Sequence, residues 1–490
     1  MTNFFKSALF TAVLLSVPGS LASEWVRAAE PLPGDDAVPI MKLPLPKIET
    51  LPNGLQIAWF LDDRLPVIDL ALLIQSGNRD DPRGKSGTAE LLGSVLERGA
   101  GGLTARQIAK AIEGLGASRY SSADEDSFSV GMHGLAPDAP ILLEYISKIA
   151  LHPDFIPAEV TREKLDLVER WNHIGDSADP LASIAFYRKV AAGTSYGRGG
   201  VASLREFEKV KREDLIAFHK KHFTPKNALL MVVGRVNSEE FKKRIETLFG
   251  DWKGEAPVRD YRPYTDNRIV PPAGSAKAKQ AAKEILIVNR PGLTQSQVRL
   301  GFKSISVRSP ERYPLTVANA LLGEYFNSRL NAVIRDQLGL TYGIESGFAY
   351  SQDLTRFGIS SATQTENTGK VIAKTLEILK AVKGGDISEE EVKLSKQYLV
   401  GGYPLSVSTL GAVATRWATG YLFKLGPEYL NEFSSKIGAV TRPEVVESVA
   451  KNFDLDHLTI VVAGDAEAIK KSLKASGFTN LREIPISALK

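Results

Sequence analysis

The 490-residue sequence contains no cysteine. This absence excludes disulfides, a cysteine nucleophile and a lipidated cysteine after a cleavage site. The chain also has little net charge, because 61 basic and 57 acidic residues leave a formal net charge of +4. No block of basic residues is interleaved with aromatic residues. We therefore expect no nucleic-acid partner.

Long apolar runs are scarce as well. The run from Ala8 to Val17 holds about ten apolar residues, whereas a bilayer span needs ~20. Lys6 precedes this run and a small-x-small pattern follows at residues 20–22, which is typical of a secretory signal peptide. We predict cleavage of residues 1–22, no membrane span in the mature chain, and export to the periplasm of a Gram-negative bacterium, where a disulfide-free chain relies on core burial.

With 490 residues, of which 43% are hydrophobic, the chain is long and apolar enough to form more than one hydrophobic core. Residues 210–234 and 440–464 share Val, Arg, Lys, Phe, Val and Gly at a constant offset of 230, and Leu-Leu-Gly at 91–93 recurs at 321–323 with the same offset. A repeat of domain size predicts a duplicated domain, not a solenoid.

Composition divides the chain between the two copies. Residues 254–283 are rich in proline, alanine, glycine and lysine without sustained periodicity, which indicates a linker. The proline-rich residues 23–46 indicate an extended arm. The domains are therefore expected at 47–253 and 284–490.

Each copy begins with strands and continues with helices. Lys47 to Phe60 is predicted as strand, turn and strand, and Pro66 to Gln75 as a further strand, followed by a helix at 88–98. Thr104 and Gln107 form a capping box that begins the next helix. Further strands are expected near 127–134 and 228–234, and further helices near 138–150, 157–173, 180–192 and 212–222. This order predicts an α+β fold, with an antiparallel-rich sheet covered by helices in each domain.

The helix at 88–98 has an unusual polar face. Its apolar stripe consists of Leu91, Leu92, Val95 and Leu96. Its other side presents Glu90, Gly93, Ser94 and Glu97 at i, i+3, i+4 and i+7. Glycine and serine are weak helix formers and a poor choice for a solvent face, so this face invites a functional explanation.

Several further stretches complete a pattern. They are "LTARQIAKAIEGLGAS", "DSFSVGMHGL", "REKLDLVERW" and "YGRGG". With the duplicated halves, the chain resembles the pitrilysin/insulinase family of zinc peptidases, nearest to the bacterial relatives of the mitochondrial processing peptidase. The resemblance covers nearly the whole mature chain and implies two such chains closing as a clamshell, of which this chain would form one half.

The resemblance assigns the unusual face to an emptied zinc site. Active members carry H-x-x-E-H, in which two imidazoles one turn apart hold zinc and the glutamate activates water. Here those positions are Glu90, Gly93 and Ser94, and the family's third ligand position is Arg170, which cannot bind a metal. We expect no metal and no cofactor on this chain. An ion pair between Glu90 and Arg170 is the favoured replacement, and a weak hard-cation site at Glu90 and Glu169 is the alternative.

The second half retains the family's C-terminal signature in "NSRLNAVIRDQLGLTYGIESGF", residues 327–348. Arg335 and Tyr342 match an Arg/Tyr pair that contacts substrate at the zinc site. A guanidinium can bind peptide carbonyls and a phenol can donate a hydrogen bond to an oxyanion. Without the resemblance, Arg335 would be an exposed helix residue and Tyr342 an ordinary strand aromatic.

The resemblance therefore implies the zinc-less subunit of a heterodimeric periplasmic peptidase that hydrolyses peptides or unfolded polypeptide. A homologous H-x-x-E-H partner would supply the zinc, and this chain would supply Arg335 and Tyr342. A catalytically inert peptide-binding or scaffold protein is the second hypothesis. A self-sufficient peptidase ranks last, because no water-activating group is found near Glu90.

Three other motifs are set aside. G-x-S-x-G around Ser195 lacks a strand before it and a helix after it, so it is no nucleophile elbow. His219 and His222 are expected at an exposed, charged helix end with too few ligands for zinc. The acidic run 124–126 is expected to be a solvated turn.

Overall fold

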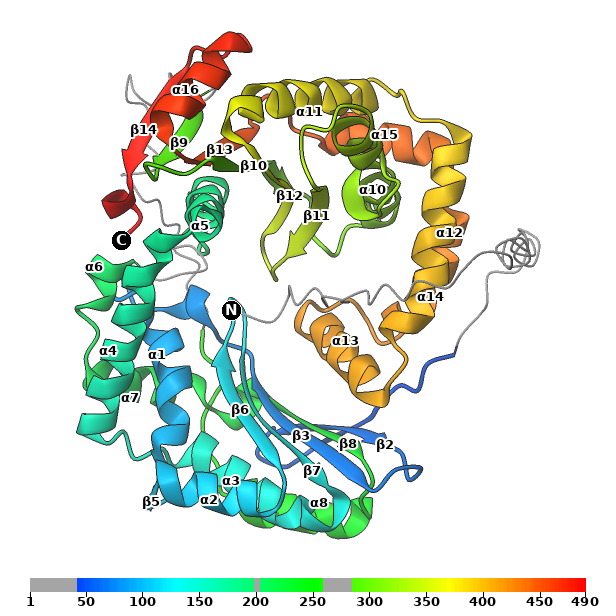
Figure 1. Cartoon of the computed structure of the whole chain (residues 1–490). Coiled ribbons are helices and arrows are strands. Elements are labelled where there is room, and N and C mark those ends of the chain that lie inside the picture. Colours follow the sequence, from blue (N-terminus) through cyan, green and yellow to red (C-terminus); the bar gives the residue numbers. More distant parts are fainter. Residues whose placement is uncertain (1–41, 198–202, 259–283) are drawn as a thin grey trace, which may run out of the picture. The chain divides into compact units, whose positions relative to one another are not determined.

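The computed structural model describes residues 42–197, 203–258 and 284–490 (Figure 1). The predicted signal peptide, most of the predicted arm and linker, and Arg198 of the "YGRGG" stretch lie outside the described residues. Within the described part, two six-stranded sheets with their helices form the α+β fold that was predicted.

The first sheet has the strand order β1-β2-β8-β3-β7-β6 and is antiparallel except between β2 and β8. Its strands are β1 (Lys47–Thr50), β2 (Gln56–Leu61), β3 (Val67–Ile74), β6 (Ser118–Ala123), β7 (Phe128–Leu135) and β8 (Ala228–Gly234). Alternation along β3 sends Ile68, Leu70 and Leu72 into the core beneath the helices. The side chains of the opposite face are therefore available for other contacts.

The helices of the first half include all those that were predicted, and α6 and α8 in addition. They are α1 (Thr88–Val95), α2 (Ala105–Gly114), α3 (Ala139–Leu151), α4 (Pro157–His173), α5 (Ala178–Val190), α6 (Leu204–Phe207), α7 (Arg212–His222) and α8 (Ser238–Phe249). A short pair of strands, β4 (Gly99–Ala100) and β5 (Leu103–Thr104), leads into α2. The predicted capping box is confirmed, because Thr104 Oγ1 accepts from the Gln107 backbone N–H and Gln107 Oε1 accepts from the Thr104 backbone N–H.

The second half repeats the arrangement, with the strand order β11-β12-β10-β13-β9-β14. Its strands are β9 (Ile285–Asn289), β10 (Gln295–Ser304), β11 (Ile344–Tyr350), β12 (Thr355–Gln364), β13 (Thr459–Gly464) and β14 (Leu481–Pro485). Its helices are α10 (Arg312–Asn319), α11 (Thr368–Lys383), α12 (Glu389–Ser406), α13 (Leu410–Leu422), α14 (Tyr429–Ala439), α15 (Arg442–Asn452) and α16 (Ala466–Ala475). The predicted duplication is confirmed.

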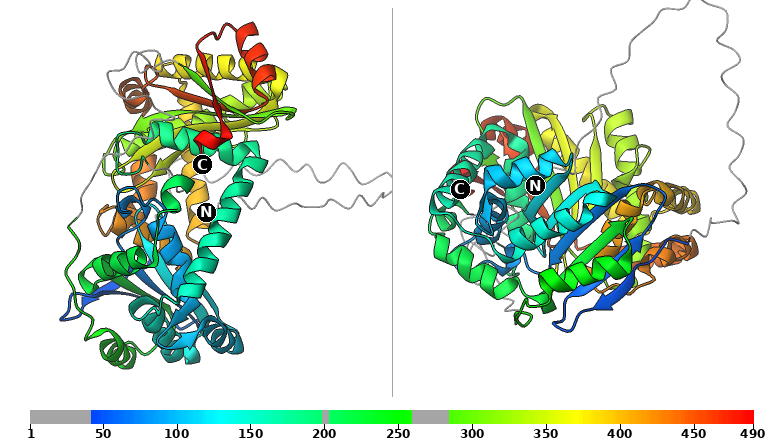
Figure 2. Two further views of the ribbon diagram at one scale, coloured as in Figure 1. Left: turned by 90° about the vertical axis from the view of Figure 1, so that its left-hand side faces the viewer. Right: turned by 90° about the horizontal axis from the view of Figure 1, so that it is seen from below.

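The two halves exchange a helix, as can be followed in Figures 1 and 2. Helix α5 of the first half buries Leu181 and Ala185 in one cluster with Leu286 and Val461 of the second sheet. Its counterpart α13 packs in a cluster on the first sheet through Val413, Ala414 and Trp417. The exchange ties the halves together through apolar burial.

No helix in the described ranges is both long enough and apolar enough to cross a membrane.

Candidate functional site

Helix α1 begins at a tightly defined point. Gly87 has φ 91°, a left-handed conformation that favours glycine. The Asp81 carboxylate accepts hydrogen bonds from the backbone N–H groups of Gly87 at 2.6 Å and Ala89 at 2.8 Å. A negative charge at this end also suits the helix dipole. The acidic residue therefore fixes the position of the face that carries the predicted site.

Glycine at position 93 allows α1 to approach the edge strand β6 closely. A Cβ on Gly93 would lie 3.1 Å from the backbone nitrogen of Ala123, which is tighter than nine in ten real Cβ contacts. The small residue on the unusual face thus has a packing role in this chain, beside its position in the zinc motif.

An open cavity of about 560 Å³ lies where α1, α4 and β6 meet. Its lining consists of Gly93, Ser94, Glu97, Arg98, Tyr120, Ser121, Glu163, Asp166, Glu169 and Arg170. The structure therefore brings Gly93, Ser94 and Arg170 to one cavity although α1 and α4 are far apart in the sequence. Glu90 is half-buried, and burial raises the pKa of its carboxyl while the charge of Arg170 opposes that rise.

The expected ion pair between Glu90 and Arg170 is not formed, so that prediction is wrong. Arg170 is exposed on α4, and its guanidinium forms no hydrogen bond or ion pair with a residue that the structure describes. Staying hydrated costs the guanidinium nothing, whereas reaching a half-buried carboxylate would remove water from both groups. Glu169, whose side chain is 70% exposed, instead lies 3.0 Å from Nε2 of His173.

The donor set does not fit zinc. The positions of the zinc motif carry a carboxyl, a glycine and a hydroxyl, and the third-ligand position carries a cation. Over the described ranges, no group of three or more His, Cys, Asp or Glu side chains is placed to hold a metal ion.

Ion pairs brace the walls of the cavity. Arg98 Nε lies 2.7 Å from Glu163 and joins the turn after α1 to α4. Arg119 Nε lies 3.2 Å from Glu97 and joins β6 to the same turn. Burial raises the pKa of Glu97, and the charge of Arg119 opposes this rise. These contacts hold α1, α4 and β6 together by charged side chains.

Arg335 and Tyr342 lie on the second half and do not line this cavity. The side chain of Tyr342 is 93% exposed. The Arg335 guanidinium carbon lies 3.9 Å from the ring centre of Phe326 and 5.8 Å from that of Tyr342. Phe326 is itself 64% exposed. Phe326 was not among the residues singled out from the sequence. The feature that could have indicated it is an apolar ring in the polar stretch "GEYFNSR", next to the signature that begins at residue 327.

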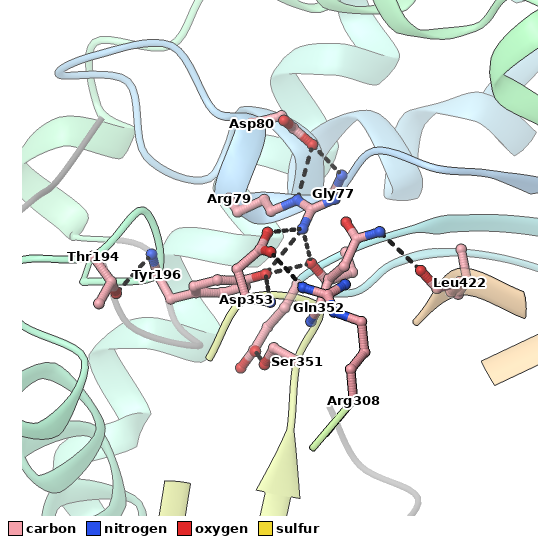
Figure 3. A network of polar contacts seen from close by, with 12 residues as sticks. Gly77, Arg79, Asp80, Thr194, Tyr196, Arg308, Ser351, Gln352, Asp353 and Leu422 are labelled. Atoms are coloured by element: carbon pink, nitrogen blue, oxygen red, sulfur yellow. Dashed lines mark hydrogen bonds and ion pairs between the residues drawn. The ribbon is translucent and has the colours of Figure 1, made fainter. Parts of the chain in front are cut away.

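A buried polar network joins the two halves (Figure 3). Arg79 is 5% exposed, and its Nη1 lies 2.5 Å from Asp126, 2.9 Å from the Tyr196 hydroxyl and 3.4 Å from Asp353 of the second half. The Tyr196 hydroxyl donates to Asp126 at 2.7 Å. Burial raises the pKa of Asp126, and the charge of Arg79 opposes that rise.

The acidic run 124–126 lies in a turn with Asp124 exposed, but the prediction of a solvated turn is wrong for Glu125 and Asp126, of which Asp126 is buried. Asp126 also accepts from the Gln352 backbone N–H at 2.7 Å, and Glu125 forms an ion pair with Arg356 at 3.2 Å. The physical reason is that the turn between β6 and β7 meets the turn between β11 and β12. Asp126 and Glu125 each have a partner more than 200 positions away, which no local pattern could indicate.

The histidine pair on α7 is likewise not exposed as predicted. His222 is buried, with Nδ1 2.9 Å from Ser76 Oγ and its ring stacked on Phe218. His219 Nε2 lies 2.7 Å from the Ala150 carbonyl oxygen, and burial lowers the pKa of this imidazole. Both side chains are structural. Ser195 follows α5 in a turn, as expected of a residue outside a nucleophile elbow.

Two family models match the chain, one within the first half and one that runs from the first half into the second. The model described as "Insulinase (Peptidase family M16)" matches residues 62–198, and "Peptidase M16 inactive domain" matches residues 209–399. The first match contains the α1 face and the second contains Arg335 and Tyr342.

Individual relatives agree with these matches. A zinc protease of Mycobacterium tuberculosis, itself uncharacterised, is 23% identical over 74% of this chain and 80% of its own length. Mouse mitochondrial cytochrome b-c1 complex subunit 2 is 25% identical over 89% of this chain and 90% of its own. The crystal structure of a peptidase M16 inactive domain from Pseudomonas fluorescens has a TM-score of 0.75 at 20% identity, covering 86% of this chain and 98% of that one. The fold, the two family matches and the resemblance of its motifs agree, and the chain belongs to the insulinase family of peptidase-like proteins, peptidase M16.

Proposed function

We propose that this chain is the zinc-less subunit of a heterodimeric zinc peptidase that cleaves peptides or unfolded polypeptide in the periplasm. The observation that carries the proposal is an asymmetry between the halves. The α1 face has lost every group of the zinc motif, whereas Arg335 and Tyr342 of the second half are present, Arg335 half-buried and Tyr342 exposed.

The first half lacks the means to hold a catalytic zinc. Such a site needs three protein ligands and an open position for water. Glu90 is the one ligand type among the four motif positions, and Arg170 would repel a cation. Hydrolysis therefore requires a metal centre from another chain, and a homologue that retains H-x-x-E-H would supply it.

The second half offers the complementary groups. The Tyr342 hydroxyl faces solvent and can donate a hydrogen bond to the oxyanion that forms when water attacks a peptide carbonyl. The Arg335 guanidinium, held over Phe326, can donate to a neighbouring peptide carbonyl of the substrate. Both would act on a peptide bound at the partner's zinc, with the two chains closed as a clamshell.

The first half would retain a place for the polypeptide itself. Strand β6 is an edge of its sheet and contributes Tyr120 and Ser121 to the cavity. An edge strand can pair with an extended segment through backbone hydrogen bonds.

The test is kinetic. The chain is purified with its zinc-bearing partner, and kcat/KM for an unfolded substrate is compared among wild type, Tyr342→Phe and Arg335→Ala. Loss of one oxyanion donor lowers the rate by about 10²–10³-fold in other enzymes, so we expect a fall of that order for Tyr342→Phe. Leu338→Ala, an exposed side chain nearby in sequence, serves as the matched control. Equal kcat/KM in all four proteins would contradict the proposal.

A scaffold role is the second candidate. It is favoured by the relative from the mouse cytochrome b-c1 complex, which aligns along 89% of this chain. If the protein isolated from its own organism runs in a large assembly that has no chelator-sensitive peptidase activity, the scaffold role replaces the peptidase.

A further inference from the structure

Helix α12 carries apolar side chains on two opposite faces. One face is buried in the second half through Val392, Ser395, Leu399 and Tyr403. The other is exposed and carries Leu394, Tyr398 and Leu405, with exposed fractions of 45%, 46% and 80%. With Gly401, these residues recur at i, i+4, i+7 and i+11, which places them on one stripe. Contiguous exposed apolar surface on a folded chain is a candidate interaction site.

Two adjacent glycines lie in the middle of this stripe. Glycine weakens a helix interior relative to alanine. A Cβ on Gly401 or Gly402 would meet nothing within 4 Å, whereas one on Gly420 of α13 would lie 2.1 Å from the Tyr429 ring. The packing of this chain therefore requires glycine at 420 but not at 401 and 402. The close approach of a backbone from outside the chain would require it there.

Tyr398 of the exposed stripe contacts the segment that leads to the residues of the proposed function. The ring centre of Tyr398 lies 5.1 Å from that of Tyr325. The next residue, Phe326, holds the Arg335 guanidinium, and Tyr342 lies beyond it. The stacked pair of Tyr398 and Tyr325 and the cluster of Phe326, Arg335 and Tyr342 are thus joined by consecutive residues of the chain.

The domain duplication gives this surface a counterpart. Residues 391–403, "EVKLSKQYLVGGY", align with residues 159–171 of α4, "EVTREKLDLVERW". Gly401 and Gly402 then occupy the positions of Glu169 and Arg170, and Tyr398 that of Asp166. These three residues of α4 line the cavity of the first half. The exposed stripe of α12 therefore corresponds to the cavity-lining wall of the duplicated fold.

We propose that Leu394, Tyr398, Gly401, Gly402 and Leu405 bind an extended substrate segment that carries apolar side chains. The proposal rests on the function proposed above. A stable subunit interface buries about 800 Å² and 20–30 residues on each side. This stripe is one helix wide and suits a single extended chain, whose backbone would cross at the glycines while its side chains pack on Tyr398 and Leu405.

The test uses the full chain without its partner. Fluorescence anisotropy measures binding of two labelled synthetic peptides, one with Phe and Leu at alternate positions and one with Ser in their place. Gly401→Leu/Gly402→Leu is expected to lower affinity for the apolar peptide at least about tenfold, a loss that side-chain blockage of the crossing point readily produces. Its melting temperature should be unchanged or higher, because leucine is the better helix former and meets open space. Gly114→Leu on α2, also open, is the matched control.

Three results would overturn the proposal. The first is no preference of the wild-type chain for the apolar peptide. The second is equal peptide binding by the double variant and the wild type. The third, from a separate co-purification with the zinc subunit, is that the double variant loses assembly, which would make the stripe a subunit interface. Failure of the proposed function is separate. In that case kcat/KM of the assembled enzyme would not change when Arg335 or Tyr342 is replaced. The glycine double variant would still have a lower affinity for the apolar peptide.

Discussion

Replacing Arg79 by alanine tests how strongly the buried network holds the two halves together. The Arg79 side chain is 1% exposed and contacts Asp126, Tyr196 and Asp353. Its loss would leave Asp126, whose side chain is 10% exposed, buried without its cation. Removing one partner of a buried ion pair costs about 3–5 kcal/mol, a large share of the roughly 5–15 kcal/mol that stabilises a folded domain.

The assay is urea unfolding followed by fluorescence, with Glu311→Ala as the control. Glu311 pairs with Lys451, whose side chain is 64% exposed, so its loss should cost no more than about 1 kcal/mol. We expect Arg79→Ala to lower the unfolding midpoint far more than the control and to split the transition, because the halves lose their polar link. A loss below about 1 kcal/mol, with one unchanged transition, would refute the view that the network joins the halves.

Three further outcomes are expected. The triple variant Glu90→His/Ser94→His/Arg170→Glu restores two imidazoles and a carboxylate and should bind zinc, as measured by elemental analysis. It should gain no peptidase activity, because Gly93 supplies no base. A metal-free triple variant would show that α1 and α4 do not bring these three positions together. Burial lowers the pKa of His219, so as pH falls below 6.5 the unfolded chain binds a proton more readily than the folded chain, and the folded chain loses stability. His219→Gln should make the urea unfolding midpoint less dependent on pH. The same pH dependence in both proteins would contradict this prediction. Trp417→Ala removes the ring packed against Phe60 at 5.7 Å and should cost about 3–5 kcal/mol by calorimetry, unlike Leu405→Ala on an exposed face.

Much of the fold could be predicted because its signals are local. Helix α4 matches the predicted residues 157–173, since proline at its first position and an apolar period fix it from nearby sequence. The capping box of α2 was equally visible. Strand β6 was missed, because "SRYSSA" is a polar edge strand without the apolar alternation of a core strand.

The site could be predicted only in part, because its remaining features depend on distant contacts. The positions of the zinc motif were found from one helix, but whether Glu90 reaches Arg170 depends on how α1 and α4 pack. The burial of Asp126 depends on a turn of the second half. The exchange of α5 and α13 could not be predicted either, because an apolar stripe on a helix does not indicate which sheet the helix covers.

The most direct measurement is a peptidase assay on three samples: the chain alone, the chain reconstituted with its H-x-x-E-H homologue, and the reconstituted pair after treatment with a zinc chelator. We predict cleavage of unfolded polypeptide by the reconstituted pair only, with the chain alone and the chelated pair inactive. Cleavage by the chain alone would contradict the loss of its own metal site. Equal cleavage by the homologue with and without this chain would contradict its part in the reaction.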